Sequence, residues 1–305
     1  CVTGKHIVSL VELGYQVVVT YGNGPQVGFL LWRSEVAHAT SGLHGLPLVT
    51  CVADTQGGIG YQIQQTLKNE FLRRGLCEDS IAVLTQVVVD DPGFRNPTKP
   101  VGEFYPPERA EVLRRENPSW VLREDAGRGF RRYVPSPRPL EIVEEAGLRT
   151  LLASGLHLIA GGGGGIPVFR TEGGYEGVDA VVDKDLTSCL LAKRIKSDLF
   201  VISTAVSNVA IHFGTPEQEN ISRMTVAEAM ACVLRSGQYA SQGPGGGGLR
   251  QGNRQGGHHH LAGKRPRRGR GRQGDAYRPL IGAQSFERTD VCRALRVSGT
   301  LRKVL

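Results

Sequence analysis

Four segments of this 305-residue chain suit binding of a phosphorylated ligand: two are rich in glycine, one joins a lysine to two carboxylates, and one follows a predicted strand. Glycine lets backbone N–H groups approach an anion closely, and the start of a helix adds a favourable dipole. A lysine beside carboxylates can neutralise a phosphoryl group in transfer while the carboxylate holds the lysine. The segments are Gly22-Asn23-Gly24, Gly161–Gly165, Asp183-Lys184-Asp185 and Thr204–Val206.

Each segment also has an ordinary structural interpretation. Gly-Asn-Gly is common in plain turns, five glycines can form a flexible loop, and Asp-Lys-Asp is typical of a solvated helix start. Lys99, in Asn-Pro-Thr-Lys-Pro, would then be a surface loop residue. No segment fits the P-loop pattern G-x-x-x-x-G-K-[ST], or the dinucleotide-binding pattern G-x-G-x-x-G followed by a ribose-binding acid. The residues alone therefore predict an α/β protein that binds a phosphorylated ligand.

The elements expected around these segments alternate between strands and helices. In open α/β sheets, ligands bind beyond the carboxyl ends of the strands, and that is where the four segments fall. The pattern predicts a layered α/β sandwich with a mostly parallel sheet, into which the proline-rich, charged stretch 91–139 is inserted as a separate lobe. Strands are predicted at Gln16–Thr20, Ile81–Val89, Leu156–Ala160 and Asp198–Thr204, and helices at 1–14, 56–75 and 184–196.

The basic charge of the chain is concentrated at one end. Residues 241–305 hold 14 Lys and Arg against three Asp and Glu, a net charge of +11, whereas residues 1–240 carry −3. Three interpretations of this Gly- and Arg-rich tail stand. In the first, Lys264–Arg272 binds RNA or another polyanion. In the second, the tail is a disordered charged segment. In the third, the tail is the product of a shifted reading frame. Because residues 241–274 have almost no apolar periodicity and many glycines, the tail is predicted to lack a packed core.

Several classes of protein are excluded. The six cysteines are widely spread, with no C-x-x-C spacing and no histidine at ligand spacing, so neither a zinc site nor a disulfide framework is predicted. This pattern favours a reducing, cytoplasmic location. No run of 18 apolar residues occurs, which excludes a transmembrane helix. The first 14 residues have the pattern of an amphipathic helix, not of a signal peptide.

Taken together and in order, the motifs resemble the carbamate kinases of the amino acid kinase family. No single motif is specific, but the combination is, and it covers residues 1–240. The matching stretches include Tyr21–Gly28 (Y-G-N-G-P-Q-V-G), Asn96–Gly102 (N-P-T-K-P-V-G), Glu124–Gly129 (E-D-A-G-R-G), Gly161–Val168, Val178–Leu186 (V-D-A-V-V-D-K-D-L) and Phe213–Gln218 (F-G-T-P-E-Q).

The resemblance implies transfer of a phosphoryl group between ATP and carbamate, giving ADP and carbamoyl phosphate with Mg²⁺, often in the ATP-forming direction. It also implies a three-layer α/β/α sandwich with a mostly parallel central sheet over residues 1–240. A protruding subdomain at 92–140 and a homodimer are further implications. Nucleic acid and membrane are not among the partners that the resemblance implies.

Site residues are implied position by position. The resemblance implies that Lys99 reaches into the site from the protruding subdomain. It also implies that Lys184 binds the phosphates and that Asp185 organises the catalytic lysines. The remaining implied residues contact the substrate phosphate or the nucleotide. They are Gly22, Asn23 and Gly24, with Gly162, Gly163, Gly164 and Gly165, for the phosphate, and Thr204, Ala205, Val206, Phe213 and Gly214 for the nucleotide.

The chain departs from the family pattern in three places. The given sequence begins inside the family's first helix, so the family's central strand and Gly-Gly-Asn phosphate loop are not part of it. Exposed edges of the sheet are expected as a result. Tyr21 replaces a histidine, and Ser241 begins a glycine-rich stretch in place of a lysine-containing segment. These departures predict a chain that recognises the ligand class but turns it over slowly. The alternative is a catalytically impaired relic whose tail binds polyanions.

Overall fold

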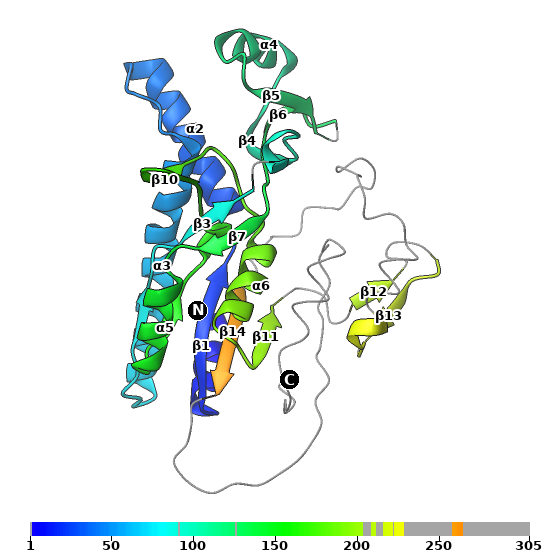
Figure 1. Cartoon of the computed structure of the whole chain (residues 1–305). Coiled ribbons are helices and arrows are strands. Elements are labelled where there is room, and N and C mark those ends of the chain that lie inside the picture. Colours follow the sequence, from blue (N-terminus) through cyan, green and yellow to red (C-terminus); the bar gives the residue numbers. More distant parts are fainter. Residues whose placement is uncertain are drawn as a thin grey trace, which may run out of the picture.

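The computed structural model shows an α/β body from which a small lobe projects (Figure 1). Its first half contains α1 (Val2–Glu12), β1 (Tyr15–Tyr21), α2 (Gly24–Ser41) and α3 (Leu48–Arg73). None of the helices in the described part of the chain is long and apolar enough to cross a membrane. The structure describes residues 2–90, 92–125, 127–203, 209–211, 216–221, 223–228 and 258–264.

The main sheet has five strands in the order β11-β14-β1-β8-β2. Besides β1 it contains β2 (Ser80–Ala82), β8 (His157–Ile159), β11 (Leu199–Ile202) and β14 (His258–Lys264). Strand β8 is parallel to both β1 and β2. Because β14 is antiparallel to both β1 and β11, these two also run in one direction. The sheet is therefore mostly parallel, as the sequence predicts.

Helices cover both faces of this sheet, and the sequence of β1 explains why. Side chains alternate between the faces of a strand, so an uninterrupted apolar run can be buried on both sides. Val17 and Val19 pack into a core with α1 and α3. Val18 packs into a second core with α5 (Glu145–Ala153) and α6 (Lys184–Arg194). The predicted three-layer α/β/α sandwich is confirmed.

A second sheet follows where the sequence predicts a single strand at Ile81–Val89. The chain leaves the main sheet after β2 and enters the second sheet at β3 (Gln86–Val89). Thr85, at this crossing, donates its backbone N–H to the side chain of Gln56, and its carbonyl oxygen accepts from that side chain and from the backbone N–H of Ile166. The single-strand prediction is wrong because periodicity does not reveal where a chain changes sheets. The second sheet has the order β10-β9-β3-β7, with β7 (Pro139–Ile142), β9 (Ile166–Thr171) and β10 (Gly174–Gly177).

The lobe is a three-stranded antiparallel sheet with one helix and its own small core. It stands at the top of Figure 1, above the second sheet. Its core joins Tyr105, Ala110, Leu113 and Leu122. The elements are β4 (Lys99–Tyr105), α4 (Pro107–Glu116), β5 (Val121–Glu124) and β6 (Phe130–Val134), in sheet order β4-β6-β5.

Strand β14 differs from the expectation of a tail without packed structure. Seven residues of that tail, His258–Lys264, pair with β1 along its whole length and with β11 on the other side (Figure 1). The backbone groups of β1 and β11 need hydrogen-bond partners, and any extended segment can supply them. These seven residues form a strand, and the absence of a packed core in the tail stays a prediction. The rest of residues 241–305 lies outside the described part of the chain.

A buried carboxyl joins the body to the lobe. The Tyr105 hydroxyl of β4 donates a 2.8 Å hydrogen bond to Oε2 of Glu35 on α2. Oε1 of Glu35 is buried without a hydrogen-bond partner among the described residues. Burial raises the pKa of Glu35 above its ordinary value of 4.5, although Tyr105, Arg132 and Arg109 act in the opposite direction.

The raised pKa of Glu35 makes stability depend on pH. The folded protein binds this proton more tightly than the unfolded chain, so Glu35 reduces stability as the pH rises from 4.5 through its folded pKa. Glu35→Gln does not titrate. Its Tm relative to the original chain is therefore expected to increase as the pH is raised from about 4.5 to about 7. Thermal unfolding across this range measures the difference, and a constant difference contradicts the prediction.

Candidate active site

Two lysine–carboxylate pairs meet at the start of α6. Nζ of Lys99, from the first residue of β4, lies 2.8 Å from Oδ2 of Asp183. Nζ of Lys184 lies 3.0 Å from Oδ1 of Asp185. Asp183 is also the N-cap of α6, because its Oδ1 accepts a 2.9 Å hydrogen bond from the backbone N–H of Asp185. One short segment thus holds a lysine from the lobe and a lysine from the body.

The two carboxylates have pKa values shifted in opposite directions. Burial acts to raise the pKa of Asp183, but Lys99 and the N–H of Asp185 outweigh it, and the pKa lies below its ordinary value. Burial raises the pKa of Asp185. The charge of Lys184 lowers this pKa only in part, and the neighbouring carboxylate of Asp183 raises it further. Asp183 is therefore the more firmly ionised of the two, and it anchors the lobe lysine electrostatically.

Removal of the lobe lysine tests this anchoring. Lys99→Met deletes the ammonium group but leaves Asp183 half-buried, so the pKa of Asp183 is expected to rise. A carboxyl-carbon NMR titration, with the signal assigned through Asp183→Asn, measures the change. In the original chain, the stability contributed by this pair is present above pH 3.8 and is lost as the pH falls through the lower folded pKa. An unchanged Asp183 titration in Lys99→Met contradicts the assignment.

The five-glycine segment is rigid and buried, which excludes the flexible-loop interpretation. All five residues are buried, and four of them, Gly161, Gly163, Gly164 and Gly165, have φ between +65° and +96°. A Cβ at Gly164 would lie 2.3 Å from the carbonyl oxygen of Val182. Only glycine fits this backbone, because other residues rarely adopt such φ values and no space exists for a side chain. The turn η2 (Gly162–Gly164) packs directly under the start of α6.

The Gly22-Asn23-Gly24 segment connects β1 to the N-terminus of α2. The stem of Lys184 lies over Gly22, where a Cβ would approach its Cδ to 3.1 Å. Asn23 is 3% exposed, and its Nδ2 donates a 2.7 Å hydrogen bond to Oγ1 of Thr55. Tyr21 is buried, with its hydroxyl bonded to the carbonyl oxygen of Gln56. The Tyr21 ring therefore belongs to the core, where a Cβ at Gly162 would collide with it.

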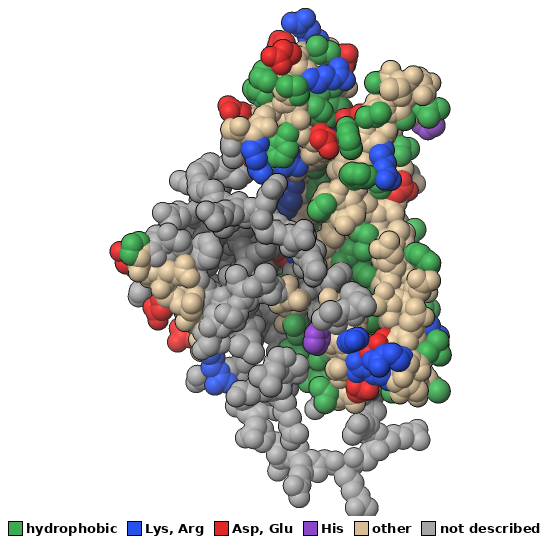
Figure 2. All heavy atoms as spheres, turned by 180° about the vertical axis from the view of Figure 1, so that it is seen from behind, with side chains coloured by type: hydrophobic (Ala, Val, Ile, Leu, Met, Phe, Trp, Pro, Cys, Tyr) green, Lys and Arg blue, Asp and Glu red, His purple; other side chains and the backbone are tan. Residues whose placement is uncertain are grey.

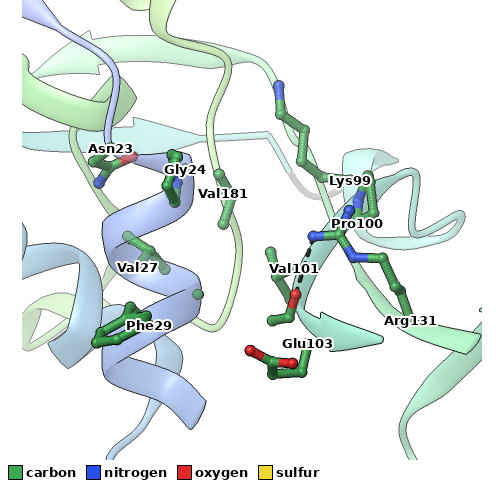
Figure 3. Close-up of a pocket in the computed structure, with 13 residues that line it drawn as sticks. Asn23, Gly24, Val27, Phe29, Lys99, Pro100, Val101, Glu103, Arg131 and Val181 are labelled. Carbon is green, nitrogen blue, oxygen red and sulfur yellow. Dashed lines mark hydrogen bonds between the residues drawn. The ribbon is translucent and has the colours of Figure 1, made fainter. Parts of the chain in front are cut away.

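A cavity of about 350 Å³ opens between α2 and the lobe. Figure 3 shows Asn23, Gly24, Val27 and Phe29 on the α2 side, and Lys99 to Glu103 of β4 opposite. Arg131 crosses from β6 and donates to the carbonyl oxygen of Gly102. The cavity has cationic groups at Lys99 and Arg131, a carboxylate at Glu103 and apolar walls at Val27, Val101 and Val181. Such a mixture of a few charged groups and apolar walls suits a small polar ligand.

The structure brings together most of the sequence-predicted site residues. Lys99, Lys184 and Asp185 share one ion-pair cluster, and both glycine segments adjoin it. The predicted nucleotide residues Thr204, Ala205, Val206, Phe213 and Gly214 lie outside the described residues. Asp183, the partner of Lys99, was not among the predicted catalytic residues, although an Asp directly before a helix is a recognisable N-cap signal. Thr55, Gln56 and Thr85 carried no sequence signal, because each is a common polar residue within an apolar pattern.

Comparison with known proteins identifies the family. The model of the amino acid kinase family matches residues 4–248. The chain belongs to this family. It is 48% identical over 236 residues to the carbamate kinase-like protein YahI of Escherichia coli K12, covering 76% of this chain and 74% of that protein. Carbamate kinase of Pyrococcus furiosus is 45% identical over 228 residues, which cover 74% and 72% of the two chains.

Solved structures of other proteins agree with the fold. Carbamate kinase of Giardia lamblia bound to AMP-PNP superposes with a TM-score of 0.73 and 41% identity, covering 79% of this chain and 76% of that one. A protein of Aeropyrum pernix K1 gives a TM-score of 0.71 at 41% identity, with coverage of 77% and 75%. The chain is thus a kinase of the carbamate kinase type.

Proposed function

We propose that the chain transfers a phosphoryl group between carbamoyl phosphate and ADP, forming ATP and carbamate, or catalyses the reverse reaction. The observation that carries the proposal is the cluster at the start of α6, where lysines from the lobe and the body converge beside two glycine segments. Phosphoryl transfer requires charge neutralisation and in-line positioning more than a covalent nucleophile. Two relatives, 45% and 43% identical to this chain, are carbamate kinases.

The proposed roles follow from charge and position. Lys184, over Gly22, neutralises the phosphoryl group in transfer, and Asp185 orients its ammonium through the 3.0 Å contact. Lys99 approaches the substrate from the lobe, while Asp183 holds it in place. The Gly22–Gly24 and Gly162–Gly165 segments supply backbone N–H groups and close approach for the phosphate oxygens.

Magnesium is proposed to enter as part of the nucleotide substrate. Both oxygens of Asp183 and one of Asp185 are engaged by the lysines or by a backbone N–H. No group of three or more metal-binding side chains occurs within the described ranges. Mg²⁺ usually keeps several waters and is bound through one or two carboxylates together with substrate phosphates. MgADP and MgATP are therefore the proposed nucleotide species.

A coupled assay tests the proposal. The full chain is incubated with MgADP and carbamoyl phosphate, and ATP is detected with luciferase while calorimetry measures binding of each ligand. We expect saturable binding of carbamoyl phosphate and slow ATP formation that requires both substrates. Acetyl phosphate, which also carries a high-energy phosphoryl group, is the matched control donor and is expected to react more slowly. Absence of both carbamoyl phosphate binding and ATP formation overturns the proposal.

A homodimer is also proposed. Helix α2 presents Phe29, Trp32 and Val36 on one face, and these side chains are 39–49% exposed. Figure 2 shows hydrophobic side chains along the flank formed by α2 and α3. Residues three and four apart share a helix face, and exposed aromatic side chains on one face are typical of an interface. Light scattering of Trp32→Glu against the original chain tests this, since a dimer is expected to dissociate.

A further inference from the structure

Two adjacent polar residues of α3, Thr55 and Gln56, are nearly completely buried beneath the candidate active site. Each is 3% exposed. Burial of polar side chains is costly unless their hydrogen bonds are satisfied, so their partners indicate what they stabilise. All the partners except Val52 belong to the segments that surround the site.

The Gln56 side chain links the five-glycine segment to the sheet crossing. Its Nε2 donates to the carbonyl oxygens of Thr85 at 3.1 Å and Gly162 at 3.0 Å. Its Oε1 accepts a 2.8 Å hydrogen bond from the backbone N–H of Thr85. The Thr85 hydroxyl in turn accepts a 2.9 Å hydrogen bond from the N–H of Gly161. One side chain amide therefore holds the glycine segment at its start and the crossing between β2 and β3.

Thr55 holds the other glycine segment, Gly22–Gly24, through the side chain of Asn23. Oγ1 of Thr55 donates to the carbonyl oxygen of Val52 at 2.6 Å and accepts from Nδ2 of Asn23 at 2.7 Å. The Asn23 side chain is fixed between this hydroxyl and the glycine segment, because a Cβ at Gly163 would lie 2.0 Å from its Nδ2. The backbone carbonyl of Asn23 also begins the hydrogen bonding of α2, accepting from Val27 at 2.9 Å.

We propose that Thr55 and Gln56 are positioning residues, which hold the Gly22–Gly24 and Gly161–Gly165 segments in the mutual arrangement that phosphoryl transfer requires. This inference rests on the proposed function. Neither residue needs to touch substrate. Both act through backbone groups and through Asn23, and a displacement of about 1 Å in such groups can reduce the rate by about 10²-fold.

The matched variants separate positioning from a general contribution to folding. Thr55→Val removes both hydrogen bonds of the hydroxyl at nearly constant volume, and Thr55→Ser retains them. Gln56→Glu places a carboxylate oxygen against the carbonyl oxygens of Thr85 and Gly162. Gln16→Glu makes the same change at the far end of β1, where Nε2 of Gln16 donates to the carbonyl oxygens of Leu152 and Leu156.

The experiment measures kcat and KM for ATP formation and, independently, hydrogen exchange of the glycine segments in the ligand-free full chain. We expect Thr55→Val and Gln56→Glu to lower kcat/KM by about 10²-fold. Gln56→Glu is also expected to speed exchange at Gly164 and Gly165, whose N–H groups bond within the turn. Thr55→Ser and Gln16→Glu are expected to stay within about threefold of the original chain in kcat/KM, even if Gln16→Glu lowers the Tm.

Two results overturn the inference. One is equal loss of kcat/KM in Gln56→Glu and Gln16→Glu at equal loss of Tm, since this indicates stability alone. The other is unchanged exchange at Gly164 and Gly165 in Gln56→Glu. If the original chain shows neither carbamoyl phosphate binding nor ATP formation, the proposed function fails, but the exchange measurement still decides whether Gln56 holds the glycine segment.

Discussion

Lys184→Ala is expected to reduce ATP formation from ADP and carbamoyl phosphate by about 10³-fold, to the background of the assay. The Lys184 ammonium is the positive group beside the glycine segments, and Asp185 holds it there through a contact of 3.0 Å between Nζ and Oδ1. Loss of a preorganised group that stabilises transition-state charge affects the chemical step more than ligand binding. Single-turnover luciferase detection measures the rate, because the original chain is itself expected to be slow.

Two further variants of α6 test whether the loss of activity in Lys184→Ala is caused by removal of the charge at this position. Lys184→Met keeps the side-chain stem over Gly22 and removes only the charge, so it is expected to lose as much activity as Lys184→Ala. Lys193→Ala removes a lysine from the last turn of the same helix and is expected to retain activity within about threefold. Activity of Lys184→Met close to that of the original chain contradicts the proposed role.

Gly164→Ala is expected to lower the free energy of unfolding by about 3–5 kcal/mol, through backbone strain and overpacking together. Gly164 has a φ of +96°, and a Cβ there would lie 2.3 Å from the carbonyl oxygen of Val182 and 2.9 Å from its carbonyl carbon. Both colliding atoms belong to the backbone and cannot move away by rotation of a side chain. Urea unfolding measures the loss through the midpoint at constant m-value.

Gly147→Ala is the matched control for this substitution. Gly147 lies in α5, and a Cβ there meets nothing within 4 Å. Alanine has the higher helix propensity, so this variant is expected to gain up to about 1 kcal/mol. If Gly164→Ala unfolds within about 1 kcal/mol of the original chain, the glycine segment is more adaptable than its geometry indicates.

The sequence by itself determined the class of fold and the chemistry of the site. The apolar run at Gln16–Thr20 is long enough to be buried on both sides, so a covered, mostly parallel sheet followed from local pattern and is observed in β1. Helices α1 and α6 were predicted within a few residues, as were strands β1, β8 and β11, because their periodicity is local. Helix α3 begins at Leu48, well before its predicted start at residue 56, and helices α2, α4 and α5 were not predicted. The choice of Lys99, Lys184 and Asp185 depended on motif order, which is also a property of the sequence.

The tertiary structure decided which groups meet. No spacing in the sequence shows that Lys99 pairs with Asp183, 84 positions away. Nor does periodicity reveal that the run at Ile81–Val89 divides between two sheets, since at the division the distant side chain of Gln56 bonds both backbone groups of Thr85. Strand β14 is a similar case, because a weakly apolar segment pairs wherever β1 and β11 offer unpaired backbone groups. Hydrogen bonds between residues distant in sequence are satisfied only in the folded chain, and local patterns carry no record of them.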